Sequence, residues 1–266
     1  MDRKSARVAA PMEEAEYRKL AAVEDRMWYF AALHRLIEHA LQKRLAGGPA
    51  QILDAGCGTG GLIARLAPAY PAWSWTGVDV SPLGCALARE RWGVPLRPGF
   101  GVQAEHALPR IVEADITSLP FPDACFDAVV SADVLYHVAD DQQALREFRR
   151  VLRPGGVLIL NLPAHPWLWS YHDAAVGGLR RYRRSGLARQ LSAAGFSSVR
   201  LTHWNTLLLP LIAFRRKCLP APAGGSDVHE FSRPLELLGR AATALERGWL
   251  DLAPLPFGSS LLAVGR

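Results

Sequence analysis

The stretch ILDAGCGTGG, residues 52–61, constrains the fold more than any other part of the chain. An apolar run ends there in a glycine-rich turn, and the turn leads into a helical pattern. This order predicts the first strand, turn and helix of an open, mostly parallel α/β sheet. The glycines at 56, 58 and 61 fit the G-x-G-x-x-G turn that holds a pyrophosphate. Those at 56, 58 and 60, behind Asp54, fit a turn that holds S-adenosylmethionine (SAM).

The rest of the chain repeats this alternation of strand and helix. Helices are predicted near 60–68, 82–91, 141–152 and 185–194. Candidate strands are 51–55, 74–79, 111–114, 126–132, 157–162, 198–203 and 260–265. We expect a three-layer, Rossmann-like α/β domain with helices on both faces of the sheet. Ligands of such sheets bind beyond the carboxyl ends of the strands.

Three regions define the expected domain organisation. Residues 1–48 are predicted to form an N-terminal helical lid, frayed over 1–12 and helical over 13–46. Residues 49–203 are predicted to form the cofactor-binding core. Residues 204–266 combine a cap insertion with the closing strand of the same domain.

Within these regions three segments depart from the strand–helix rhythm. Residues 163–184 join the cap insertion as a candidate substrate cap. Pro220–Asp227 is a flexible linker by composition. Residues 93–110 form an insertion rich in proline and glycine.

Composition narrows the class of protein. Half of the 266 residues are hydrophobic, so a large core is possible. The net charge is +6, but the arginines are scattered, and basic charge alone does not indicate nucleic-acid binding. The four cysteines form no C-x-x-C motif and no metal-ligand spacing, which predicts no metal site and a reduced, cytoplasmic protein.

Hydropathy sets further expectations. The N-terminus has no long apolar run and is not a secretory signal. The most apolar later stretch, TLLLPLIAF at 206–214, is about half as long as a membrane span. We expect a small-molecule substrate, no nucleic-acid partner, no membrane span, and a monomer or homodimer.

Three acids choose between the two glycine-turn patterns. Asp79 ends the second strand, where a carboxylate can accept both ribose hydroxyls of either cofactor. Asp115 follows the third strand, where it can accept from the exocyclic amine of adenine while Ile116 covers the ring. Asp54 lies where it would repel a pyrophosphate, whereas the cationic groups of SAM favour a nearby acid. The acids therefore favour SAM.

Four segments, in order, are ILDAGCGTGG, GVDVSP, VEADITSLPFPDACFDAVVSADVLYHV and ALREFRRVLRPGGVLILNLPA. Their order and spacing over residues 51–164 resemble the class I SAM-dependent methyltransferases. The resemblance implies a seven-stranded sheet whose last strand runs antiparallel. It also implies that SAM is contacted by Gly56, Gly58, Gly60, Asp79, Asp115 and Ile116. The flanking segments 24–37 and 163–196 resemble a bacterial subgroup of that family, which implies no particular substrate.

The full set of cofactor-binding candidates joins these residues to others near the same turn. It comprises Asp54, Gly56, Gly58, Gly60, Asp79, Val80, Asp115, Ile116, Trp28, Tyr29 and Asp133. Trp28 and Tyr29 have two readings, because an aromatic pair on the N-terminal helix can pack in the core or cover SAM with a ring near its sulfonium.

Catalytic and substrate candidates follow the fourth and fifth strands. His137 can remove a proton near neutral pH, or it can be a structural histidine. His172 and Tyr182 are the other catalytic candidates, with Asp173 as an acid that could orient His172. The substrate-binding candidates are Tyr136, Trp169, Asp173, Arg181, Trp204 and Asn205. Among them, Arg181 could pair with a carboxylate or phosphate of the substrate.

These observations predict a SAM-dependent methyltransferase that modifies a small, partly hydrophobic molecule at oxygen, nitrogen or carbon. Three alternatives stay open. The chain could use SAM for a reaction other than methyl transfer. It could be an NAD-dependent oxidoreductase, which Asp54 and Asp115 disfavour. It could also bind SAM without catalysis.

Overall fold

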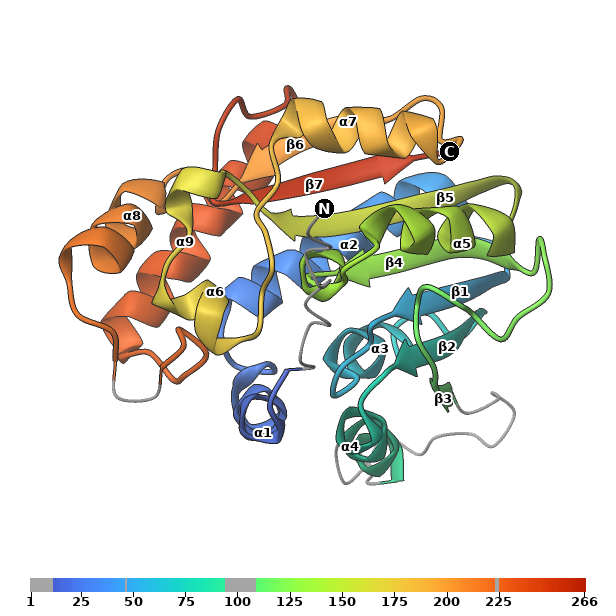
Figure 1. Ribbon diagram of the computed structural model, residues 1–266, viewed down its shortest axis with the longest axis horizontal. Helices are drawn as coiled ribbons and strands as arrows, with labels where there is room; N and C mark the ends of the chain where they lie inside the picture. The colour runs from blue at the N-terminus through green and yellow to red at the C-terminus, as the bar shows by residue number, and fades with distance from the viewer. Residues whose placement is uncertain (1–11, 46, 94–108, 223–224) are drawn as a thin grey trace, which may run out of the picture.

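The computed structural model describes residues 12–45, 47–93, 109–222 and 225–266. Within these ranges seven strands form one sheet in the order β3-β2-β1-β4-β5-β7-β6 (Figure 1). The pairs among β1 to β5 are parallel, and β7 runs antiparallel to both of its neighbours. The expected mostly parallel sheet with an antiparallel last strand is confirmed. The predicted frayed residues 1–11 and most of the insertion, 94–108, lie outside the described residues.

The strands are β1 (Ala50–Ala55), β2 (Trp73–Asp79), β3 (Arg110–Glu113), β4 (Phe126–Ala132), β5 (Leu152–Pro163), β6 (Arg200–Trp204) and β7 (Ser260–Gly265). The helices between them are α3 (Gly61–Leu66), α4 (Pro82–Gly93), α5 (Asp141–Val151) and α7 (Arg184–Ala193). The N-terminal helices are α1 (Glu14–Val23) and α2 (Trp28–Leu45). Beyond the strand ends lie η1 (Leu135–His137), η2 (Pro166–Leu168), α6 (Tyr171–Ala175), α8 (Leu209–Cys218) and α9 (Arg233–Leu250).

The central strands read as continuous apolar runs because both faces of the sheet are buried. Successive residues of β1 point to opposite faces, so Ile52 packs in one layer and Leu53 in the other, and neither is exposed. The inner face of α2 buries Leu33, Ile37 and Leu41. This helix covers one face of the sheet and packs along α9.

The carboxyl ends of β1, β4 and β5 point toward one end of the molecule (Figure 1). The helices α1, α6, α8 and α9 gather at that end, beyond the strands. Segments from the N-terminus, the middle and the C-terminal quarter of the chain therefore surround the place where ligands of parallel sheets bind.

Two local expectations need correction. The predicted continuous helix over 13–46 is broken at residues 24–27, where the chain turns and buries Glu24 beside Thr59 and Arg91. The predicted flexible linker Pro220–Asp227 ends in packed residues. There Ser226 donates to Glu16 at 2.8 Å, and Asp227 pairs with Arg216 at 2.8 Å. Residues 223 and 224 of that segment lie outside the described residues.

Candidate functional site

A cavity of about 1120 Å³ opens beyond the carboxyl ends of the strands. One part is walled by the glycine turn and the ends of β2, β3 and β4. The other part is walled by α2, α8 and α9, while α1 faces the glycine turn. A cofactor and a second molecule can therefore share one continuous space.

The glycine turn adopts a backbone that only glycine takes without strain. Gly56, Gly58 and Gly60 have φ values of +88°, +53° and +80°. A Cβ on Gly56 would overlap the side chain of Val134. Gly56 and Gly58 line the cavity, but Gly60 does not, because it packs on Ala88 of α4. Gly60 thus shapes the turn without facing the cavity.

Asp79 is held by three donors at the end of β2. Its Oδ1 accepts from the hydroxyl of Tyr17 at 2.8 Å and from the backbone N–H of Ser81 at 2.9 Å. Its Oδ2 accepts from the N–H of Gly58 at 2.8 Å. A carboxylate has about four acceptor positions, so Oδ2 can accept one further hydrogen bond. The side chain lines the cavity, with Val80 beside it.

Asp54 is buried in β1 at the base of the turn, where its carboxyl forms no hydrogen bond with any described residue. Burial, with the charges of Asp79 and Glu24, raises the pKa of Asp54 to about 8. Burial likewise raises the pKa of Glu24 to about 7, although Arg91 pulls it down. An acidic, partly unsatisfied pocket of this kind favours a ligand that carries positive charge and hydrogen-bond donors.

Asp115 lies just past β3 and lines the cavity with Ile116. Its Oδ1 accepts from the N–H and the hydroxyl of Thr117, both at 2.8 Å. Its Oδ2 forms no hydrogen bond with a described residue. Thr117 therefore fixes the direction of the carboxylate and leaves one oxygen open. These acceptor carboxylates at the turn, at β2 and at β3 fit the donor groups of SAM, which are its amino group, its ribose hydroxyls and its adenine amine.

A buried network lies where the cofactor part of the cavity meets the apolar part. Tyr29 of α2 donates to Oδ2 of Asp133 at 2.8 Å, and Asn161 donates to Oδ1 of Asp133 at 2.9 Å. Trp204 stacks on Tyr29 with ring centroids 5.1 Å apart and donates to Asn161 at 2.7 Å. Asp133 has φ +55°, an uncommon conformation for a residue with a side chain. Burial raises its pKa to about 6.

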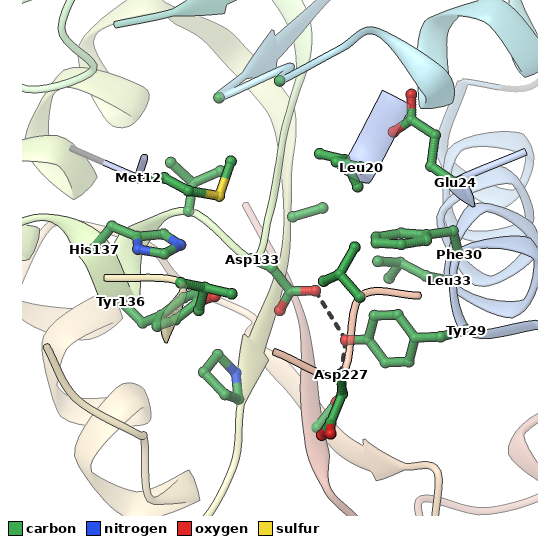
Figure 2. Close-up of a pocket in the computed structure, with 18 of the residues that line it drawn as sticks. Met12, Leu20, Glu24, Tyr29, Phe30, Leu33, Asp133, Tyr136, His137 and Asp227 are labelled. Carbon is green, nitrogen blue, oxygen red and sulfur yellow. Dashed lines mark hydrogen bonds between the residues drawn. The ribbon is translucent and has the colours of Figure 1, made fainter. Parts of the chain in front are cut away.

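His137 faces the cavity from η1, next to Tyr136, with ring centroids 3.9 Å apart. Figure 2 shows these two rings on one side, Tyr29 and Phe30 on the other, and Asp133 between them. Burial lowers the pKa of His137, so the ring is neutral near pH 7. Its Nδ1 is buried and has no hydrogen-bond partner among the described residues.

His172 also lines the cavity, but its Nδ1 accepts a 3.1 Å hydrogen bond from the N–H of Asp227. Burial and the nearby Arg216 lower its pKa to about 4. The neutral ring therefore carries its proton on Nε2, which can donate to a ligand but cannot accept a proton from it. The predicted pairing of His172 with Asp173 is wrong, because Asp173 pairs instead with Arg181.

That ion pair also corrects the expectation for Arg181. Its Nε donates to Asp173 at 2.7 Å, its Nη1 donates to the carbonyl of Ala164 at 3.0 Å, and the two charged side chains are 2% and 1% exposed. Both residues line the cavity. Because Asp173 neutralises the guanidinium, Arg181 braces the cavity wall and is not a free cation for a substrate anion.

Three other candidates lie outside the cavity wall. Tyr182 is buried behind it and donates to Asp141 at 2.8 Å, so it is not placed to act as a base. Trp169 is partly exposed on the cap, where its carbonyl accepts from Lys217. Trp204 supports Tyr29 from behind. Asn205, by contrast, lines the cavity with φ +58° and donates to Ser259 at 2.8 Å.

Several residues of this site carry no signal in the sequence. Tyr17 and Glu24 approach the turn from α1 and the bend after it, and no local motif marks either one. Leu20 and Phe30 line the same space, and Trp28 lines it while packing on Gly239 of α9. Trp28 is therefore buried by packing and also lines the cavity.

Comparison with known proteins places this arrangement in a family. Residues 53–160 match the Methyltransferase domain family. The chain is 36% identical over 143 residues to a demethylmenaquinone methyltransferase of Thermus thermophilus, covering 53% of this chain and 60% of that protein. It is 31% identical over 214 residues to a malonyl-[acyl-carrier protein] O-methyltransferase of Geobacter sulfurreducens, covering 75% and 72%.

A SAM-dependent methyltransferase of Thermotoga maritima has the same fold, with a TM-score of 0.52 at 14% identity and 94% of each chain covered. Within the described residues no helix has the length and apolarity needed to cross a membrane. The chain spans 60% of the Thermus protein but more than two thirds of the Geobacter protein. Its sheet order, its glycine turn with three acids and these similarities together show that the chain belongs to the class I SAM-dependent methyltransferases.

Proposed function

We propose that this chain transfers the methyl group of SAM to a small acceptor with an apolar part. The observation that carries the proposal is the continuous cavity. It joins the carboxylates of Asp54, Asp79 and Asp115 to apolar side chains of the cap, such as Leu208 and Ile212. Bound SAM supplies an electrophilic methyl carbon. The protein has to hold the two molecules in line and keep water out.

Each acid has a distinct role in holding SAM. Asp79 accepts a ribose hydroxyl at Oδ2, where one acceptor position is free. Asp115 accepts from the adenine amine at Oδ2, and Ile116 covers the ring. Asp54 lies next to the amino group of the methionine part, and a cation there lowers the energy of its ionised form.

His137 is the proposed proton acceptor for the reacting group. Its lowered pKa keeps the ring unprotonated near pH 7, and its Nδ1 is not engaged by any described residue. Asp133, fixed by Tyr29 and Asn161, is the proposed group that orients the acceptor. Neutral His172 donates from Nε2 to an oxygen of the acceptor.

The acceptor is proposed to be small and partly hydrophobic. The two relatives are named for methylating demethylmenaquinone and a malonyl group on an acyl-carrier protein. The apolar side chains of the cap that line the cavity support an acceptor with an apolar portion here. We also propose that the chain is divided into a lid over 1–48, a core over 49–203 and a cap over 204–266. Described residues from each of these three regions line the cavity.

Calorimetry with SAM, S-adenosylhomocysteine and NAD tests the cofactor assignment. We expect SAM and S-adenosylhomocysteine to bind and NAD not to bind. Asp79→Ala is expected to weaken SAM binding at least about tenfold, the scale for losing a charged acceptor. The control Asp127→Ala removes a carboxylate that pairs with Arg153 away from the cavity. Binding of NAD without SAM, or equal SAM affinity in both variants, would overturn this assignment.

Product analysis tests the reaction. The enzyme is incubated with methyl-labelled SAM and a set of hydroxyl, amine and quinone acceptors, and the labelled product is identified by mass spectrometry. We expect S-adenosylhomocysteine and a methylated acceptor in equal amounts. SAM binding without turnover on every acceptor would favour a non-catalytic role, and a product lacking the methyl group would favour another SAM reaction.

A further inference from the structure

The cap carries most of the large hydrophobic side chains that the protein exposes. Among the described residues, fifteen large hydrophobic side chains are exposed, and eleven of them lie in residues 204–258. Three of the other four, Trp167, Trp169 and Leu179, lie in the other candidate cap segment, 163–184, and the fourth is Val80. Scattered apolar residues need no explanation, but such a concentration marks a surface that another molecule covers.

On α9 some of the exposed apolar side chains form one row, while Leu235 and Leu237 lie off it. Leu238, Leu245 and Leu252, at every seventh position along and just past the helix, are 49%, 71% and 81% exposed. Positions seven apart on an α-helix lie within about 20° of one another. Trp249, 56% exposed, lies seven residues after buried Ala242, so it stands at the border between this row and the inner face. The inner face of α9 buries Gly239, Ala242 and Thr243.

The preceding helix has a similar face. Leu207, Leu211 and Phe214 are spaced four and three residues apart, and they are 55%, 48% and 56% exposed. No residue of α8 is buried. Both helices lie at the same end of the molecule, beyond the carboxyl ends of the strands (Figure 1).

Positive charge borders these apolar faces. The last turn of α8 carries Arg215, Arg216 and Lys217, and α9 carries Arg233, Arg240 and Arg247, again seven residues apart. The acidic residues of the two helices are Glu236 and Glu246. Glu246 is buried, and Glu236 accepts from the N–H of Trp28. Arg216 pairs with Asp227 and Arg240 pairs with Glu236, so the outward positive charge of the two helices comes from Arg215, Lys217, Arg233 and Arg247.

The apolar surface is continuous with the cavity. Leu211 of α8 and Leu235 and Leu238 of α9 line the cavity, and each is 43% to 49% exposed to solvent. These three leucines connect the apolar surface of the two helices to the lining of the cavity.

We propose that the exposed face of α8 and α9 docks on an anionic lipid bilayer, with its leucines and Trp249 in the acyl boundary and its basic residues at the headgroups. An exposed apolar helix face bordered by Arg and Lys is the pattern of helices that lie in a membrane interface. A second copy of the chain fits less well, because two such positive faces repel each other. Docking is independent of the proposed function, although it would let an acceptor pass from the bilayer into the cavity.

Vesicle co-sedimentation without acceptor tests the docking. The full-length protein is mixed with vesicles of phosphatidylcholine alone or with a quarter of phosphatidylglycerol. The test variant L245E/L252E replaces two exposed leucines that do not line the cavity. The control S192E/A193E places the same charge on the exposed side of α7. Calorimetry with SAM checks that every protein is folded. It also measures SAM affinity independently of vesicle binding.

We expect the wild type to bind anionic vesicles and to bind neutral ones several-fold more weakly, with binding reduced by salt. L245E/L252E is expected to lose at least about tenfold in vesicle affinity, and the control much less. The proposal is overturned if the wild type does not sediment with anionic vesicles, or if both variants bind equally. It is also overturned if L245E/L252E instead abolishes a dimer seen by analytical ultracentrifugation without vesicles.

Discussion

The hydroxyl of Tyr17 donates a 2.8 Å hydrogen bond to Oδ1 of Asp79, which lies 62 residues later in the sequence. The bond fastens α1 to the end of β2, directly over the glycine turn. Burial, then the charge of Asp79, raises the pKa of Tyr17, so its hydroxyl stays protonated and remains a donor. The N-terminal helix and the proposed ribose-binding acid therefore form one unit.

Tyr17→Phe should destabilise the protein by about 1.5–3 kcal/mol, the range for a buried hydrogen bond to a charged group. Urea unfolding of the cofactor-free protein measures this change. The control is Tyr70→Phe, whose hydroxyl bonds Glu38 near the surface and should cost less. An equal loss in the free energy of unfolding for the two substitutions would show that the hydrogen bond of Tyr17 does not stabilise the packing of α1 on the end of β2.

Asp54 predicts how stability depends on pH. Its folded pKa, about 8, lies above the unfolded value near 3.8, so the folded state binds its proton more tightly. The stabilisation of the folded state by this bound proton is fully present below about pH 4, and it is lost as the pH rises through about 8. Asp54→Asn should therefore remove a decline of up to about 1.4 kcal/mol per pH unit between about pH 5 and 7.

Urea unfolding at several pH values without SAM measures that slope. Asp123→Asn is the control, since Asp123 is exposed and pairs with Arg150 at the surface. An unchanged slope in Asp54→Asn would mean that the carboxyl is not held protonated by its surroundings.

Asp115→Asn should change which base the pocket prefers. The substituted side chain keeps an oxygen for Thr117 but presents an NH₂ group where Oδ2 was. That group opposes the adenine amine and suits the carbonyl of hypoxanthine. We expect the affinity for SAM to fall about tenfold. The affinity for the SAM analogue that carries hypoxanthine in place of adenine is expected to rise. Parallel changes for the two ligands in calorimetry would exclude Asp115 from base recognition.

His137→Ala should leave SAM affinity nearly unchanged and lower single-turnover methyl transfer by about 100-fold or more if the ring removes a proton. His137→Gln keeps a hydrogen bond without the basic nitrogen, so recovery by Gln would indicate positioning alone. His39→Ala, at an exposed site beside Asp251, is the control. Wild-type rates in both His137 variants would show that the histidine is structural.

Arg181→Ala should destabilise the protein by about 3–5 kcal/mol, because it leaves the carboxylate of Asp173 buried without its partner. Arg153→Ala breaks a surface pair with Asp127 and should cost about 1 kcal/mol or less. Thermal and urea unfolding compare the two. If Arg181→Ala instead lowers stability only slightly and raises the KM for the acceptor strongly, Arg181 contacts the substrate.

The sequence by itself determined the order of strands and helices and the location of the three acids that line the cavity. Both follow from local signals. Apolar runs such as 126–132 mark buried strands, and the bounds of β4 and β7 agree with the prediction. Asp54, Asp79 and Asp115 sit at fixed offsets from strand ends, and parallel strands bring those ends to one edge of the sheet.

Tertiary structure decided which polar side chains remain free to act. Arg181, Tyr182 and His172 looked equally available in sequence, but Asp173, Asp141 and the N–H of Asp227 engage them. Tyr17 and Glu24 reach the glycine turn only because α1 folds back over it. A hydrogen bond or ion pair depends on distance in space, and the sequence separation of these partners, from 8 residues to 62, does not encode that distance.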